Sequence, residues 1–283
     1  MNKAEIIQKV SNTLVVAGST FSGDKIRAYQ RAIERETNPQ SRWVMEQILE
    51  NANVAKKNRG PLCDDTGIPH LYLEMGKNRS ISGSEMEAIY EGIRDGLRKL
   101  PGRPMAVMGD DTQRLDQSGG LSSDPGVLAA APIQLRTVNE DVVRLFVLME
   151  GGGPAIRGKD YRVFHKHSID VVADEIIVWA SEAVAQLGCS PCTLAVGIGR
   201  SHYEAAAMMM DAQVHGNYDI QSEFEKRLTD GVNRLGIGAL GLGGDISVIG
   251  SFVKIGPQRA SGVRIVCMRP CCCFEPRCAY VLL

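Results

Sequence analysis

The sequence predicts an α+β fold in which a helical N-terminal part is followed by mixed strands and helices with glycine-rich loops. Two observations predict it. The first hundred residues carry apolar side chains at helical spacing, whereas the later part alternates runs rich in Val, Ile and Leu with helical segments. The 283 residues contain no internal repeat and no low-complexity linker. We therefore expect one intertwined domain over residues 1–283.

The composition argues against several classes of protein. Hydrophobic residues make up 44% and charged residues 23% of the chain, which is ordinary for a globular protein with a sizeable core. Lys plus Arg number 32 and Asp plus Glu number 33, so the net charge of −1 gives no general attraction to nucleic acid or to an anionic membrane. The sequence shows neither a membrane-spanning apolar stretch nor the features of a signal peptide. We expect a cytoplasmic protein with no nucleic-acid or membrane partner.

The first hundred residues are expected to be mostly helical. Their apolar side chains recur every three or four positions, with charged side chains on the opposite face. Asn58-Arg59-Gly60-Pro61 is a strong helix stop, and Ser82-Gly83-Ser84-Glu85 is a typical helix start. The expected elements are helices at residues 1–16, 23–36, 41–57 and 82–100, a loop at residues 62–67 and a strand at residues 70–75.

The later part begins with a long loop over residues 101–127, a length that usually indicates a functional or mobile segment. Residues 130–138 and 142–149 are rich in Val, Ile, Leu and Phe, and a polar turn at residues 139–141 joins them, so we expect paired strands. The other expected elements are helices at residues 168–187, 201–211 and 221–235 and strands at residues 193–199 and 263–267.

Two further patterns are ambiguous. The glycines of residues 197–200 and 236–250 suggest close approach of backbone to a ligand or to other backbone. A dinucleotide turn is incomplete because Tyr203 occupies its last glycine position, so tight packing is the simpler interpretation. His165 and His167 would suit a metal ion if they lay on one strand, but surface pairs are more common and we assign them no role.

The eight cysteines do not resemble a secreted disulfide framework, because five of them crowd into the last seventeen residues. Cys189 and Cys192 form a C-x-x-C pair that allows three interpretations. A redox pair would precede a helix, whereas this one precedes an apolar strand. A zinc site needs a second pair at compact spacing. An iron–sulfur cluster takes thiolates from distant loops, which leaves it as the third interpretation.

Several short motifs, in order along the chain, together resemble those of class I, iron–sulfur fumarases and L-tartrate dehydratases. Cys63-Asp64-Asp65-Thr66-Gly67 resembles their C-Q-D-T-G motif, and Gly151-Gly152-Gly153 resembles their triple-glycine loop. Residues 191–199 resemble their C-P-P…V-G-I-G segment, and residues 233–244 their L-N-R-L-x-I-G…G-L-x-G run. Residues 273–277 are a weaker match to their C-terminal motif. In length and content, the chain resembles the α subunit of the two-subunit form.

The resemblance implies a hydro-lyase that adds or removes water across a C–C double bond of a C4 dicarboxylic acid. Fumarate and malate are the first expected substrates, and L-tartrate is the second. It also implies a [4Fe-4S] cluster held by three cysteines, whose open iron acts as a Lewis acid. The general base would come from a separate β subunit, in an αβ hetero-oligomer. A non-catalytic relative that binds a cluster, senses redox state or mediates an interaction is the alternative hypothesis.

The resemblance assigns two cluster ligands directly, because Cys63 and Cys192 match the cysteines of the family motifs. It also implies a cysteine beside the triple glycine, and this chain has none there. Cys189 is our preferred substitute, since its spacing allows both thiolates to reach one cluster. One of Cys271, Cys272 and Cys273 is the second choice.

The resemblance also implies a substrate site formed by Asp64, Asp65, Arg103 and the glycines Gly151, Gly152 and Gly153, with Asp65 and Arg103 as catalytic residues. Asp64 replaces the glutamine of the family motif, and its charge would repel a dianion unless the carboxyl group is protonated or turned away. A guanidinium suits a substrate carboxylate, and Arg98 is the alternative to Arg103 for this role.

Overall fold

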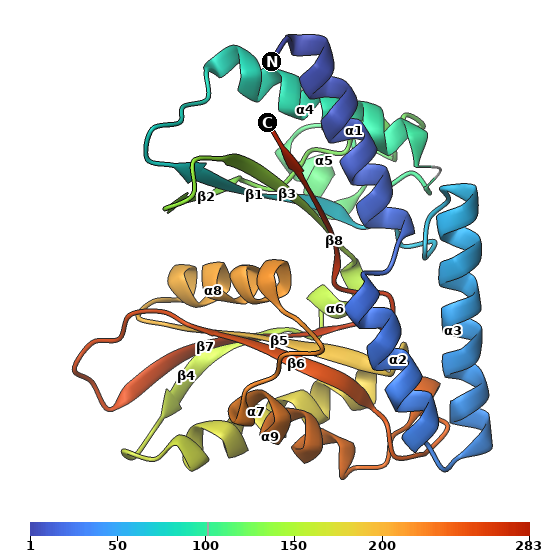
Figure 1. The fold of residues 1–283 in the computed structure, drawn as a ribbon, viewed down its shortest axis with the longest axis vertical. Coiled ribbons are helices and arrows are strands. Elements are labelled where there is room, and N and C mark those ends of the chain that lie inside the picture. The colour runs from blue at the N-terminus through green and yellow to red at the C-terminus, as the bar shows by residue number, and fades with distance from the viewer. Residues whose placement is uncertain (101) are drawn as a thin grey trace. The chain divides into compact units, whose positions relative to one another are not determined.

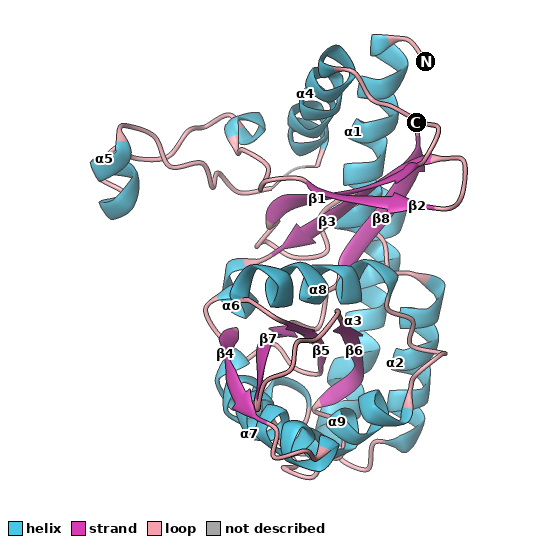
Figure 2. Cartoon of the chain, turned by 90° about the vertical axis from the view of Figure 1, so that its left-hand side faces the viewer, coloured by secondary structure: helices cyan, strands magenta, loops and turns pink. Residues whose placement is uncertain are grey.

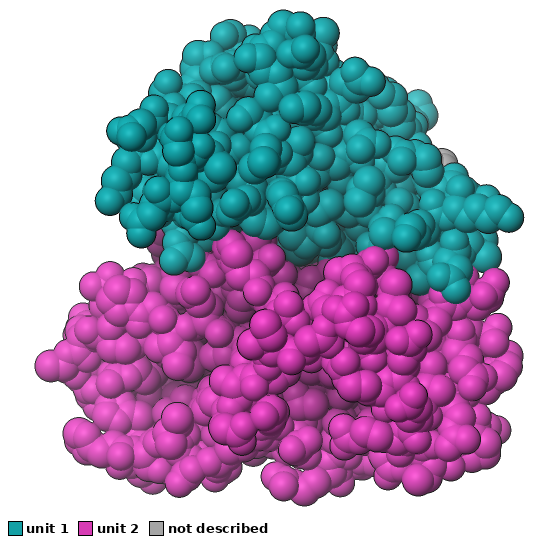
Figure 3. Space-filling view, in the orientation of Figure 1, with its two compact units in different colours: residues 1–20, 52–151, 277–283 teal, residues 21–51, 152–276 magenta. Residues whose placement is uncertain are grey.

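A computed structural model describes residues 1–100 and 102–283 (Figure 1). The chain divides into two compact units, shown in different colours in Figure 3. Unit 1 comprises residues 1–20, 52–151 and 277–283, and unit 2 comprises residues 21–51 and 152–276. The predicted α+β class is confirmed, and the prediction of one domain over residues 1–283 stays a prediction. None of the helices in the described residues combines the length and apolar character needed to cross a membrane.

Unit 1 packs two helices on a sheet whose described strands run in the order β2-β1-β3-β8. Asparagine and serine N-caps begin both helices, each in a reciprocal capping box with a glutamate of the first turn. Gly92 and Gly96 let the helices approach, since a Cβ on either would lie within 3 Å of Val10 or Leu14 Cβ. The elements of unit 1 are α1 (Lys3–Ser19), β1 (Ile68–Gly76), α4 (Gly83–Lys99), α5 (Asp111–Asp116), η1 (Pro125–Val127), β2 (Gln134–Val138), β3 (Val143–Glu150) and β8 (Arg277–Leu282).

The predicted pairing of the strands at residues 130–138 and 142–149 is wrong. Strand β1 lies between them and pairs parallel to β2 and antiparallel to β3. The turn that joins β2 to β3 crosses the end of β1, where the Gly76 amide donates a hydrogen bond to the Val142 carbonyl at 2.8 Å. A Cβ on Gly76 would lie 2.4 Å from the Glu140 carbonyl oxygen. Glycine at this position therefore makes room for the crossing.

The long loop predicted over residues 101–127 is confirmed for most of its length. Its first residue, Pro101, lies outside the described residues. The loop carries only the short helices α5 and η1, and in Figure 2 it extends away from the sheet of unit 1. A single bridge between Val107 and Leu121 brings its two arms together.

In unit 2 the described strands run in the order β4-β7-β5-β6, with α8 on one face of the sheet and α7 and α9 on the other (Figure 1). Because both faces are covered, every residue of β5 is buried, as its continuous apolar run predicts. Helix α3 contributes residues to both units. The elements are α2 (Gly23–Arg35), α3 (Pro39–Asn58), α6 (Gly152–Ala155), β4 (Lys159–Phe164), α7 (Ile169–Leu187), β5 (Cys192–Gly199), α8 (His202–His215), α9 (Glu223–Asn233), η2 (Ala239–Gly241), β6 (Val248–Ile255) and β7 (Val263–Cys271).

The glycines at the end of β5 serve packing. A Cβ on Gly197 would lie 2.0 Å from the carbonyl oxygen of Ala205 and 2.2 Å from the amide nitrogen of Met209, both in the backbone of α8. Neither atom can move without displacing the helix. The structure therefore favours the packing interpretation of this glycine over a nucleotide-binding turn.

We expect Gly197→Ala to lower the free energy of unfolding by about 3 kcal/mol, because the added methyl group forces α8 away from β5. Urea unfolding followed by circular dichroism measures the change. Gly262→Ala is the matched control, since a Cβ there meets no atom within 4 Å. It should change stability by less than about 0.5 kcal/mol. Equal stability of the two variants would contradict the packing role of Gly197.

Candidate functional site

The loop at residues 62–67 of unit 1 folds around the carboxylate of Asp64. The Cys63 thiol donates to Asp64 Oδ1 at 3.4 Å, and the Asp65 amide donates to the same oxygen at 2.9 Å. These two hydrogen bonds, with a smaller contribution from the charge of Arg103, lower the pKa of Asp64 below its usual value. The carboxyl group is therefore charged at neutral pH, and it is turned toward the thiol and backbone of its own loop.

Arg277, the first residue of β8, holds this loop in place. Its side chain is buried, and Nη1 donates to the Asp65 carbonyl oxygen at 2.9 Å. Gly67 has a φ of +87°, and a Cβ there would lie 2.7 Å from Arg277 Nη2 and 2.9 Å from the Glu150 backbone. Glycine is thus required between the arginine and the end of β3. Sequence reasoning missed Arg277, although it ends the weak C-terminal motif.

The two candidate arginines lie in different surroundings. Nη2 of Arg103 is 3.8 Å from Asp65 Oδ1, and its side chain is 57% exposed. Arg98 instead makes a two-pronged ion pair with Asp124, with Nε and Nη2 at 3.0 and 2.8 Å from the two carboxylate oxygens. The structure therefore brings Arg103, and not Arg98, to the Cys63 loop.

The triple glycine lies where β3 ends. Gly151 follows β3 directly in unit 1, and Gly152 and Gly153 are the first two residues of α6 in unit 2. Because the Glu150 backbone packs against Gly67, the end of β3 lies beside the Cys63 loop within unit 1. His70 Nε2 lies 3.6 Å from Glu150 Oε2 at the same place.

Unit 2 brings together five cysteines, which we call the cysteine-rich site. Its members lie at or just before the start of β5 and at or just after the end of β7, and they are Cys189, Cys192, Cys271, Cys272 and Cys273. Strands β5 and β7 pair with Thr193 opposite Cys271, and the Cys273 amide donates to the Cys189 carbonyl at 2.9 Å. Cys192 is wholly buried, whereas Cys272 is half-buried and Cys189 is exposed.

The thiols of the cysteine-rich site influence one another. Burial raises the pKa of Cys192 far above its ordinary value, and the nearby Cys272 raises it further. The Cys272 hydrogen bond and burial raise the pKa of Cys273 in the same direction. Both thiols are therefore protonated at neutral pH without a bound metal. Because metal binding requires thiolates, occupation of this site releases protons and strengthens with rising pH.

One face of α2 packs against the turn at residues 271–276. The Tyr29 hydroxyl donates to the Cys273 carbonyl at 2.7 Å, and Lys25 Nζ donates to the Glu275 carbonyl at 2.7 Å. Burial lowers the pKa of Lys25 to about 8, and the nearby Cys272, Cys273, Cys271 and Glu275 oppose the change. The sequence did not point to either residue. The two lie four positions apart, about one helical turn, in an amphipathic segment.

The donors fit an iron–sulfur cluster by their chemistry. Soft thiolates suit iron–sulfur clusters rather than Mg²⁺ or Ca²⁺, and such clusters take cysteines from separate segments. Cys63 belongs to unit 1 and Cys192 to unit 2. Across the described part of the chain, no three His, Cys, Asp or Glu side chains already form a metal-binding group. The cysteine-rich site therefore supplies suitable donors without a preformed set of ligands.

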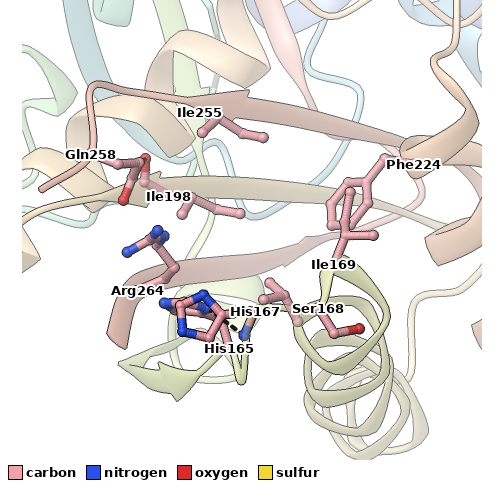
Figure 4. Close-up of a pocket in the computed structure, with 10 residues that line it drawn as sticks. His165, His167, Ser168, Ile169, Ile198, Phe224, Ile255, Gln258 and Arg264 are labelled. Carbon is pink, nitrogen blue, oxygen red and sulfur yellow. Dashed lines mark hydrogen bonds between the residues drawn. The ribbon is translucent and has the colours of Figure 1, made fainter. Parts of the chain in front are cut away.

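The histidine pair predicted as ambiguous lies at the other end of β5, beside Ile198. There a pocket of about 230 Å³ is lined by apolar side chains together with His165, His167 and Arg264 (Figure 4). His165 Nε2 lies 2.7 Å from the Ser261 carbonyl, and its Nδ1 accepts a hydrogen bond from the His167 amide at 2.9 Å. Both nitrogens of His165 are used, and His167 has a φ of +54° in a turn. His165 therefore has a structural role in this turn.

Comparisons with known proteins agree with the motifs. The model of the family described as fumarate hydratase (Fumerase) matches residues 7–281. A putative L(+)-tartrate dehydratase subunit alpha of Methanocaldococcus jannaschii is 29% identical over 245 residues, which cover 82% of each chain. The L(+)-tartrate dehydratase subunits alpha of Escherichia coli K12 and Shigella boydii are each 24% identical over 280 residues, covering 95% of this chain and 90% of theirs.

Proposed function

Because the chain belongs to the fumarate hydratase (Fumerase) family, we propose that it is the α subunit of an iron–sulfur hydro-lyase acting on a C4 dicarboxylic acid. The predicted enzyme class, a hydro-lyase, agrees with this family. The observation that supports the finer proposal is the convergence of Cys192 with Cys271, Cys272 and Cys273 in one largely buried part of unit 2. These thiols come from segments far apart in the sequence, as cluster ligands do.

The proposed cluster ligands are Cys63, Cys192 and Cys272. We prefer Cys272 to Cys189 as the third ligand, because Cys272 is close enough to the buried Cys192 to raise the pKa of its thiol. Cys189 is exposed, and it raises the pKa of Cys273 rather than that of Cys192. Cys189, the first choice from the sequence, is therefore the alternative. When bound, the [4Fe-4S] cluster would supply a Lewis-acidic iron for the departing hydroxide of the substrate.

The residues of this chain would bind and orient the substrate. Arg103 would bind one carboxylate through paired N–H donors, and Asp65 would position that guanidinium. The glycines Gly151, Gly152 and Gly153 would allow close approach of backbone N–H groups. The carboxylate of Asp64 accepts hydrogen bonds within its own loop, where it would orient Cys63.

The general base is proposed to come from a β subunit. The relatives named above are alpha subunits, which implies that each acts with a second subunit. We propose the same αβ arrangement for this chain, together with the cytoplasmic location expected from the sequence. An alternative of another class is a cluster-binding or redox-sensing relative that does not catalyse hydration. The cysteine-rich site suits both candidates, so turnover must separate them.

Anaerobic reconstitution with iron and sulfide tests the proposal. The chain, co-expressed with its β subunit, is expected to bind about four irons per αβ pair. The loaded pair should turn over fumarate and malate or, as the names of the relatives suggest, L-tartrate. Iron binding without turnover of any of the three acids would favour the non-catalytic alternative. A folded pair that binds no iron would overturn both candidates.

A further inference from the structure

Lys25 places a positive charge inside unit 2, where lysine side chains are almost never fully buried unless they are paired. The residue is 1% exposed. Its ammonium group donates to the Glu275 carbonyl at 2.7 Å and lies 4.4 Å from the centre of the Phe21 ring. Both groups attract a cation, but neither carries the full negative charge that a buried ammonium group needs.

The carboxylate of Glu275 forms an ion pair with another residue, and among the neighbours that raise the pKa of Lys25 it contributes least. Its Oε2 lies 3.0 Å from Nη2 of Arg269, and both side chains are buried. The turn that Lys25 contacts carries two of the candidate ligands. In it the Glu275 amide donates to the Cys272 carbonyl at 2.9 Å, and the Cys273 carbonyl accepts from the Tyr29 hydroxyl at 2.7 Å. A thiol binds a metal as the thiolate, so a ligand supplied by this turn would bring a negative charge close to the Lys25 ammonium group. The fold has thus built a buried cation beside the segment that offers the third ligand.

We propose that Lys25 is the counter-cation of the iron–sulfur site, a positioning residue that compensates the negative charge of the ligand thiolates. This inference rests on the proposed function and adds a residue to its site. Lys25 acts in two ways. Its charge stabilises the loaded site and favours the more reduced cluster, and its hydrogen bond to Glu275 fixes the turn that carries Cys272.

Lys25→Met tests the inference in the full chain with its β subunit. We expect the reconstituted variant to lose iron to a chelator about tenfold faster than the wild type, the usual range for a residue that supports metal ligands. Its cluster should also have a lower reduction potential. Lys25→Arg keeps the charge and should recover most of both properties. Without iron, Lys25→Met should be at least as stable to urea as the wild type, because methionine replaces a buried charge.

Tyr29→Phe is the matched control, since it removes a hydrogen bond to the same turn without removing a charge. It should leave the reduction potential unchanged. Equal iron loss and potential in Lys25→Met and the wild type would overturn the inference, as would equal changes in Lys25→Met and Tyr29→Phe. Unfolding of the iron-free Lys25→Met variant would also overturn it, by showing that the lysine is structural. A folded wild-type pair that binds no iron would instead overturn the proposed function, and this inference with it.

Discussion

Replacement of Cys192 by alanine is expected to abolish cluster binding and hydro-lyase activity while the chain stays folded. Cys192 begins β5 and is wholly buried, so its sulfur is held in place by the strand and by the core around it. Loss of one of three ligands removes the metal centre, whose Lewis acidity is worth several kcal/mol, or at least about a thousandfold in rate. Truncation of one thiol should cost only about 1 kcal/mol of stability. Iron content, kcat and urea unfolding measure the three effects.

Cys278→Ala is the control for removal of a cysteine. Cys278 lies in β8 of unit 1, and burial raises the pKa of its thiol to about 12. It pairs with Leu148 between β8 and β3 and does not belong to the cysteine-rich site of unit 2. The variant should keep its iron and its activity. If both cysteine variants lost iron equally, the loss would reflect general damage, and the assignment of Cys192 as a ligand would fail.

The same measurement identifies the third ligand. Cys272→Ala should lose iron as Cys192→Ala does, because Cys272 is the thiol that raises the pKa of the buried Cys192. Cys189→Ala should retain it. The reverse result would make Cys189 the ligand, as the sequence alone suggests. Retention of iron by both variants would point to Cys271 or Cys273.

The elements that the sequence predicted well are those defined by local signals. The capping boxes at Asn2 and Ser82 begin α1 and α4, and the apolar run of β5 matches a strand covered on both faces. Strand β4 escaped prediction because most of its residues are exposed, and β6 because it begins within a glycine-rich segment. Where such a signal exists, it lies within a few residues of the element that it specifies. Strands β4 and β6 have no such signal.

Strand order depended on contacts that no local signal describes. A short polar turn normally joins neighbouring strands, but here β1 lies between the two. The order of the strands is apparent only in the structure, where the Glu140 backbone crosses over Gly76. The energetic benefit of that arrangement comes from distant segments, so the sequence around the turn could not reveal it.

The residues of the candidate site also differ in whether a local signal reveals them. The motif at residues 63–67 pointed to Cys63 and Asp65, since a short motif keeps its residues together. Lys25 and Arg277 were missed, because each acts through a backbone carbonyl of a segment far away in the sequence. In an amphipathic helix Lys25 looks like any exposed charge. Only the packing of α2 on the turn at residues 271–276 shows that it is buried.

Arg103→Met is expected to lower kcat/KM for the dicarboxylic substrate about a hundredfold, mainly through a higher KM. The exposed guanidinium lies 3.8 Å from Asp65 and faces the surroundings of the Cys63 loop with most of its side chain accessible. A hydrogen-bonded contact between charged groups is worth about 1.5–3 kcal/mol, which corresponds to roughly 10- to 150-fold in binding. Methionine keeps the length and apolar stem of the side chain and removes only the charge and the donors. Steady-state kinetics on the reconstituted pair measures the effect.

Arg98→Met removes the same charge from a neighbouring position and is the matched control. Arg98 pairs with Asp124, so its loss should reduce stability slightly and leave KM close to that of the wild type. If Arg98→Met raised KM as much as Arg103→Met, general attraction between the substrate and a positive surface would explain both effects. High salt would then abolish the difference from the wild type, because screening weakens long-range attraction more than direct contact. A KM increase confined to Arg103→Met that persists in salt requires a direct contact with the substrate carboxylate.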